Sequence, residues 1–232
     1  MKQLFFSILI AALIISCKKD SDSAIPVTSS SLMVFQAVPG PAKFDVVLDT
    51  FAVGNDLGYG EQTGYKQFRA RKYTLMVFPA GNRTNPLAGG EINLRNNRFY
   101  SAFLGVDINN ALVLIAAEDE LDAPKEAGNA KLRVVNLSDT RYGTANTRLL
   151  LDYYTDTTKI LPRIGFGNIT PFKEIKGDST YKIDVRWADS SLSVLGKEKV
   201  PFASKANGIY TIVTSGNALD PNDIKLFQVI NK

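Results

Sequence analysis

Short segments in which apolar and polar residues alternate recur along this chain after residue 30. From Tyr181 to Trp187 every second residue is apolar, and Lys182, Asp184 and Arg186 stand between them. Strand residues two apart share a face, so this period predicts a β-strand with one face against a core. Similar segments, separated by clusters of Gly, Pro, Asn and Asp, lie at 32–38, 44–50, 98–104, 111–117, 131–137, 147–154, 208–214 and 224–230.

The second half of the chain repeats the first. Residues 58–66 (GYGEQTGYK) align with 165–173 (GFGNITPFK), with four identical pairs and two exchanges between aromatics. A repeat longer than 100 residues indicates domain duplication, because solenoid units are only ~20–50 residues long. Further segments align in the same order: 44–49 with 147–152, 73–77 with 181–185, and 97–100 with 207–210.

The repeat and the strand pattern together predict the fold class. No amphipathic helix of ordinary length follows residue 30, and about seven short strands per ~100 residues are typical of a β-sandwich. We therefore expect an all-β protein with two tandem, immunoglobulin-like β-sandwich domains at 31–119 and 130–232. The segment 120–129 (ELDAPKEAGN) has linker composition. It suggests few shared contacts, so we expect each repeat to fold alone.

The start of the chain predicts export. Lys2 precedes an apolar run, 4–16, that is shorter than the ~20 residues of a membrane-spanning helix and fits a signal peptide. Its end at Ser16-Cys17 resembles the lipobox of bacterial lipoproteins, which implies removal of residues 1–16 and lipid attachment to Cys17. A secretory peptide with an incidental cysteine is the alternative. Residues 17–30 read as a flexible tether.

The polar residues after Cys17 bear on localisation. Lys18-Lys19-Asp20 resembles the surface-export signal of Bacteroidetes-type lipoproteins. We expect a lipid-anchored protein of the cell envelope, on the outer membrane. The sequence does not decide whether it faces the periplasm or the cell surface. Two or more acyl chains would make the anchorage durable.

Charge adds little to this picture. The net charge is +4, and the densest basic cluster is 69–72 (RARK). A nucleic-acid site would need a larger patch with aromatic stacking partners. We expect instead a solvated edge, or loose attraction to an anionic cell envelope, and no nucleic-acid partner.

The composition removes several kinds of active site. The chain has no histidine, and its one cysteine is Cys17. Ser-His-Asp and Cys-His nucleophiles are therefore excluded, as are zinc sites built on imidazole or thiolate. Paired carboxylates remain possible, but the acidic run 118–122 reads as a solvated interdomain segment. We expect no enzyme activity, no catalytic residue and no cofactor.

Two further motifs read as structural. The turns at 107–110 (DINN) and 220–223 (DPND) carry oxygen ligands, but too few for calcium, and Asp, Asn and Pro suit a tight turn. We expect no metal site there. The glycine pairs at 58–60 and 165–167 lack the Gly-Lys-Ser/Thr and the helix of a phosphate loop. We expect their aromatic middle residues to fill the interior of each sandwich.

The repeated elements resemble the domain-of-unknown-function 4397 family of exported bacterial proteins. An Arg-Val-Val-Asn strand opens that pattern, and a strand carrying Asp, an aromatic-Gly turn and a Tyr strand follow. The matching segments are 132–138, 44–49, 59–65 and 166–172. Residues 70–72 and 177–180 depart from the family's usual Ala-Gly. The resemblance implies a β-sandwich with no assigned activity.

These observations favour a lipid-anchored, non-catalytic binding or spacer module, with envelope proteins or glycans as partners. The alternative is a carbohydrate-binding or carbohydrate-active envelope protein, which would need paired acids in a cleft or an exposed aromatic platform. Trp187 is the only tryptophan. Because it continues the apolar alternation of its strand, we expect it to be mostly buried near the edge of the second core.

Overall fold

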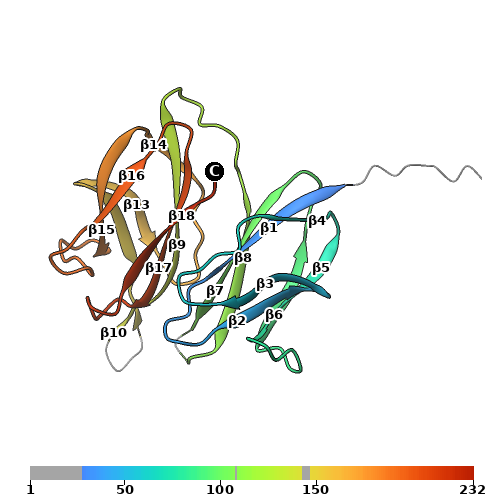
Figure 1. Ribbon diagram of the computed structural model, residues 1–232. Helices are drawn as coiled ribbons and strands as arrows, with labels where there is room; N and C mark the ends of the chain where they lie inside the picture. The colour runs from blue at the N-terminus through green and yellow to red at the C-terminus, as the bar shows by residue number, and fades with distance from the viewer. Residues whose placement is uncertain (1–27, 108, 143–146) are drawn as a thin grey trace, which may run out of the picture.

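The computed structural model describes residues 28–107, 109–142 and 147–232, and these residues form strands and connections without a helix (Figure 1). The predicted signal peptide, Cys17 and the tether up to Val27 lie outside the described residues. No candidate membrane-spanning helix occurs in the described part of the chain.

The first half of the chain forms one β-sandwich of two four-stranded sheets. Strand β1 pairs in parallel with β7, and the other pairs in both sheets are antiparallel. Alternate residues of these strands, such as Leu32, Val46 and Leu75, point between the sheets and form the first core. In spatial order the sheets are β4(Lys66–Arg69), β1(Ser29–Gln36), β7(Phe99–Val106), β8(Leu112–Asp119), and β3(Phe51–Leu57), β2(Phe44–Leu48), β5(Lys72–Pro79), β6(Ala88–Asn93).

The second half forms a sandwich with the same order of strands. A two-stranded ribbon of β10(Arg141–Tyr142) and β11(Thr147–Arg148) precedes its second sheet. The predicted fold class is confirmed, with eight strands in each sandwich instead of about seven. The sheets are β14(Lys173–Lys176), β9(Asn129–Asp139), β17(Ile209–Asn217), β18(Lys225–Ile230), and β13(Thr158–Ile164), β12(Leu151–Thr155), β15(Ser179–Trp187), β16(Val200–Ser204).

Strand β15 has the faces that its alternation predicts. Ile183 and Val185 are buried in the second core, and Trp187 packs against that core while keeping part of its surface exposed. The opposite face is less exposed than expected. Asp184 is buried there, because the connection to β16 folds back and Ser193 Oγ donates to its carboxylate over 2.7 Å.

One of the sequence alignments between the repeats is wrong. It placed Asp152 opposite Asp49, whereas the structure places Asp152 opposite Asp45. Asp45 accepts the backbone N–H of Asp56 over 2.9 Å, and Asp152 accepts that of Arg163 over 2.8 Å. Asp56 and Arg163 share a left-handed backbone, with φ of 53° and 56°. The repeats are therefore shifted by four residues relative to the predicted register here.

A third core lies between the two sandwiches. The sheet containing β1 and β7 packs its outer face on the sheet containing β9 and β17, so these strands are buried on both faces (Figure 1). The expectation of few contacts between the repeats is therefore wrong. We call this cluster the third core, and its buried members are Met33, Phe35, Ala37, Phe103, Val135, Leu137, Val213 and Val229.

Candidate functional site

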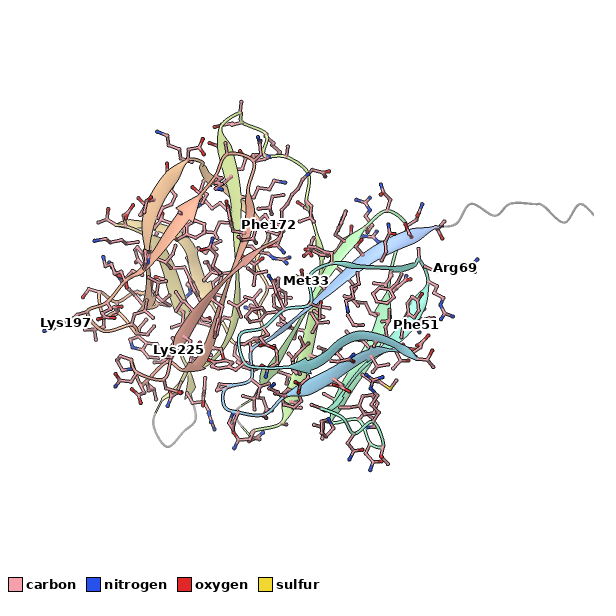
Figure 2. The ribbon with its side chains drawn as sticks, in the orientation of Figure 1. Met33, Phe51, Arg69, Phe172, Lys197 and Lys225 are labelled. Atoms are coloured by element: carbon pink, nitrogen blue, oxygen red, sulfur yellow. The ribbon has the colours of Figure 1, made fainter. Side chains whose placement is uncertain are left out.

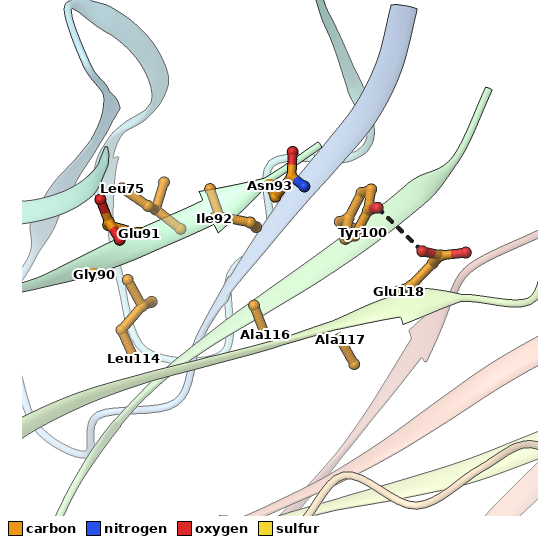
Figure 3. A pocket seen from close by; sticks show the side chains of 10 residues that line it. All are labelled: Leu75, Gly90, Glu91, Ile92, Asn93, Tyr100, Leu114, Ala116, Ala117 and Glu118. Carbon is orange, nitrogen blue, oxygen red and sulfur yellow. Dashed lines mark hydrogen bonds between the residues drawn. The ribbon is translucent and has the colours of Figure 1, made fainter. Parts of the chain in front are cut away.

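A pocket of about 300 Å³ opens along the side of the first sandwich, where the edge strands β6 and β8 lie next to each other (Figure 3). Leu75, Ile92 and Leu114 give it an apolar lining from three strands. Tyr100 lines the pocket too, and its hydroxyl donates to Glu118 Oε2 over 3.0 Å. The pocket therefore combines an apolar surface with a charged rim, which is the usual composition of a small binding site.

The charges at this rim are held by partners. Glu118 pairs with Arg95 and lies 3.5 Å from Arg98. Burial raises the pKa of Glu118, but the hydrogen bonds from Arg95 and Tyr100 and the charges of both arginines outweigh burial, so the pKa is lowered. Glu118 therefore stays ionised at neutral pH and is unsuited to act as a general acid, which needs a raised pKa.

A second carboxylate, Glu91, lines the same pocket and pairs with Lys72 over 2.7 Å. Two carboxylates beside an apolar pocket are the arrangement that glycoside cleavage requires, but one of them must carry a proton. Both carboxylates here face a cation. The pocket is consequently better suited to binding than to acid–base chemistry.

The second repeat offers different chemistry at the equivalent place. Tyr210 corresponds to Tyr100, since each hydroxyl accepts a backbone N–H five residues earlier in the chain. The strand register then places Ile230 where the first repeat has Glu118. Ile230 is 61% exposed and lines a pocket with Lys205. The two repeats therefore do not present equivalent binding surfaces, which was left open by the sequence.

A buried polar network joins the sandwiches beside the third core. Asp119, at the end of β8, forms an ion pair of 2.6 Å with Arg133 of β9, and neither side chain is exposed by more than 2%. Tyr65 and Ser101 donate to the other carboxylate oxygen over 2.5 Å each. Burial and the charge of Asp119 raise the pKa of Tyr65.

The network continues into the second sandwich. Arg133 Nε donates to Thr211 over 2.9 Å, and Asn231 Nδ2 donates to the hydroxyl of Tyr65 over 3.0 Å. The guanidinium of Arg133 lies 4.5 Å from the ring centre of Phe172. The acidic run at 118–122 is thus not simply a solvated segment. Glu120 and Asp122 are exposed, but Asp119 is buried and joins the two domains.

The aromatic-glycine turns have a structural role, but at a different place from the one expected. The ring of Tyr59 meets Phe227 edge-on at 5.0 Å, and its hydroxyl lies 3.3 Å from Ser215 Oγ. Phe166 also packs against the third core. Both aromatic residues therefore fill the boundary between the sandwiches instead of the interior of either one. Gly60, with φ of +83°, leaves room for Phe227.

The two acidic turns are used for their own backbone. Asp107 Oδ1 accepts the N–H groups of Asn109 and Ala111, and Asp220 Oδ1 accepts that of Asn222. Within the described ranges there is no group of three His, Cys, Asp or Glu residues that could hold a metal ion. Asp107 and Asp220 therefore hold the backbone of their own turns, which is a usual role of Asp in tight turns.

The basic cluster at 69–72 lies in the turn from β4 to β5 and is exposed except for Ala70. Arg71 pairs with Asp49 over 3.1 Å and lies over the ring of Tyr73. The predicted lipidation residue, Cys17, lies outside the described residues.

The pocket in Figure 3 was not predicted from the sequence, because Arg95, Tyr100 and Glu118 come together only when the strands of the sheet pair.

Residues 30–142 match a family described as Domain of unknown function (DUF4397). The DUF4397 match begins in β1, covers the first sandwich and ends at β10. It supports the resemblance that the repeated motifs indicate. No curated protein matches the chain.

Two solved structures give weak similarities. One is CBMbc (family CBM26) from Eubacterium rectale Amy13K in complex with maltoheptaose, with 8% identity, a TM-score of 0.27, and coverage of 87% of this chain and 97% of that chain. The other is the Bacillus anthracis TIE protein, with 13% identity, a TM-score of 0.25, and coverage of 82% and 34%. At these scores neither similarity bears on fold or function.

Proposed function

We propose that this protein is a lipid-anchored, non-catalytic cell-envelope protein that acts as a binding or spacer module. In this proposal residues 1–16 are removed as a signal peptide, and lipid on Cys17 holds the chain on the outer membrane. The tether was predicted to reach residue 30, but it ends before β1, which begins at Ser29. Residues 31–119 and 130–232 are the two working domains, joined by 120–129.

The third core is the observation that carries a binding or spacer role. Two sandwiches joined by a loose linker would move independently. Here apolar side chains from both sheets are buried together, and the Asp119–Arg133 pair lies beside them. Moving the sandwiches apart would expose that apolar surface and a buried charge pair, and both changes are costly. The domains therefore form one stiff unit that holds its far end at a fixed distance from the tether.

We also propose that the second sandwich is a second copy of the DUF4397 domain. Its strand order is that of the first, and small local interactions recur. Thr63 Oγ1 accepts the N–H of Val34 over 3.0 Å, and Thr170 Oγ1 accepts that of Val134 over 2.9 Å. A shared side-chain bond at matching positions supports common descent more specifically than the shared fold does.

The pocket beside Glu118 is the best-defined binding surface for this role. Its apolar lining and fixed carboxylates suit a partner segment with an apolar residue next to a basic or hydrogen-bonding one. The aromatic ring within it, Tyr100, is only 6% exposed, so it offers no open face for stacking on a sugar. This geometry favours an envelope protein over a glycan as the partner.

Lipidation is tested by mass spectrometry of the membrane form. We expect an acylated Cys17 as its first residue, and we expect Cys17→Ser to leave the protein uncut or soluble. A mature form that begins elsewhere and carries no lipid would contradict the anchor.

The binding role is tested by photo-cross-linking on intact cells. A photoreactive residue at Ala116, in the pocket wall, should capture one envelope protein reproducibly. The same residue at exposed Lys197, in the connection between β15 and β16, is the matched control and should not capture it. Capture of glycans alone at Ala116 would favour the carbohydrate-binding alternative, and equal capture at both positions would contradict a site at the pocket.

A further inference from the structure

The chain enters the first sandwich beside its basic turn. The backbone N–H of Ala70 donates to the carbonyl of Thr28, the first described residue, over 2.9 Å. Arg69 and Arg71 flank this contact and are exposed. The point where the tether reaches the domain is therefore fixed against the densest basic cluster of the sequence.

An exposed aromatic residue lies at the same end. Phe51 is 51% exposed, and it lines an open hollow of about 710 Å³ together with Thr28, Phe68 and the two arginines. Figure 2 shows Phe51 and Arg69 on this end of the first sandwich, away from Lys197 and Lys225 of the second sandwich. A large apolar side chain beside arginines is the composition of a membrane-interface surface.

The two arginines differ in how they are held. Arg71 is positioned by Asp49 and by the ring of Tyr73, with its guanidinium carbon 4.4 Å from the ring centre. Arg69 makes no ion pair with any described residue and points outward (Figure 2). Its charge is consequently available to an external anion.

We propose that this end of the first sandwich, formed by Phe51, Arg69 and Arg71, docks on an anionic lipid surface. The inference rests on the proposed lipid at Cys17, because only ten residues lie between Cys17 and Thr28. An extended chain of that length spans at most roughly 40 Å, so the anchor keeps this end near the headgroups. Phe51 then enters the interface, and the arginines contact phosphates.

Vesicle sedimentation tests the docking without the anchor. The mature chain, residues 17–232 with Cys17→Ser, is mixed with vesicles of phosphatidylcholine alone or with added phosphatidylglycerol. We expect binding only to the anionic vesicles, and we expect it to weaken as salt is raised. Arg69→Glu with Arg71→Glu should weaken it by roughly tenfold or more, since each basic residue near the surface contributes appreciably. Phe51→Ser should weaken it as well.

The matched control makes the same charge change elsewhere. Lys197→Glu with Lys225→Glu, on the second sandwich, should leave vesicle binding unchanged, as should Leu192→Ser, which replaces a side chain that is 67% exposed. Equal losses in both sets, or no preference for phosphatidylglycerol, would overturn the docking proposal. Thermal melts of each variant separate loss of binding from loss of folding. If the chain docks but the cellular form lacks lipid on Cys17, only the anchor fails; if it is acylated but does not dock, only this inference fails.

Discussion

Asp119 Oδ1 and Arg133 Nη2 lie 2.6 Å apart across the boundary between the two sandwiches, and both side chains are buried. Asp119 ends the last strand of the first sandwich, and Arg133 lies in the first strand of the second. Buried charges need partners for all their polar atoms, because desolvation is expensive. Tyr65 and Ser101 donate to Asp119 Oδ2, and Arg133 Nε donates to Thr211. Asp119 Oδ1 and Arg133 Nη2 make no hydrogen bond to any described residue and are compensated by their ion pair alone.

Removing one member of this pair should destabilise the protein strongly. Arg133→Met leaves the Asp119 carboxylate buried without its cation, and methionine is what the first repeat carries at the equivalent position, Met33. We expect a loss of about 3–5 kcal/mol in the free energy of unfolding, measured by urea denaturation. Arg133→Met combined with Asp119→Leu should lose less than Arg133→Met alone. A single variant within about 1 kcal/mol of the parent would show that the pair is not coupled to folding.

Each half should be less stable when it is expressed alone than it is in the full chain. Residues 28–121 and 122–232 each keep a complete sandwich, but each exposes its side of the third core. We expect lower urea midpoints for the isolated halves and recovery when they are mixed. As a control, a chain cut within 122–127 after folding should elute as one species. Halves that separate after cutting and melt like the parent would contradict a shared core.

The two glycine turns at matching places in the sandwiches provide an internal comparison. Gly60 and Gly167 have φ of +83° and +78°, so alanine is strained at either position. A Cβ at Gly60 would lie 2.6 Å from Phe227, whereas Gly167 has open space. We expect Gly167→Ala to cost about 1–2 kcal/mol and Gly60→Ala at least about 1 kcal/mol more, by urea denaturation. Equal costs would mean that Phe227 moves aside freely.

Asp152 should make the free energy of unfolding decrease in acid. Burial alone would raise its pKa, but the hydrogen bonds from Lys159 and from the N–H groups of Arg163 and Asp189 outweigh burial and lower it below the ordinary value of 3.8. As the pH falls, the carboxyl of Asp152 takes up its proton in the unfolded chain before it does so in the folded protein. This contribution to stability is therefore complete above about pH 5 and is lost as the pH falls through the folded pKa. Asp152→Asn should cost about 1–3 kcal/mol at pH 7 and flatten the decline between pH 5 and pH 3.

Urea denaturation at several pH values checks this, and Asp122→Asn, in the exposed linker, is the matched control. It should change neither the neutral-pH stability nor the slope in acid. If both variants give the same pH profile as the parent, the acid sensitivity arises elsewhere.

Local pattern was enough to predict the strands with the clearest alternation, but not edge strands such as β3, β4 and β13. Alternation over 181–187 predicted β15, and the paired Gly-aromatic-Gly turns predicted two domains, which the structure shows as two sandwiches with one strand order. Both signals depend on residues close in the chain. Alignment failed between β2 and β12, because a run of apolar residues ending in Asp matched Asp152 to Asp49 equally well. Only the hydrogen-bond register distinguishes that choice from Asp45.

The pairing of the sandwiches was decided by tertiary structure. Segments such as 32–38 and 132–137 carry apolar residues on both faces, interrupted only by Gln36, Arg133 and Asn136. That is close to the pattern of a strand buried on both sides. That pattern does not show which part of the protein packs on the second face of the strand. Arg133 and Asp119 look like ordinary charged residues in the sequence, and they become a buried pair only when the two sheets meet. The strand pattern was enough to predict two β-sandwiches, because it depends on residues close in the chain. The joining of those sandwiches into one unit, and the pocket beside Glu118, depend on contacts between residues far apart in the chain.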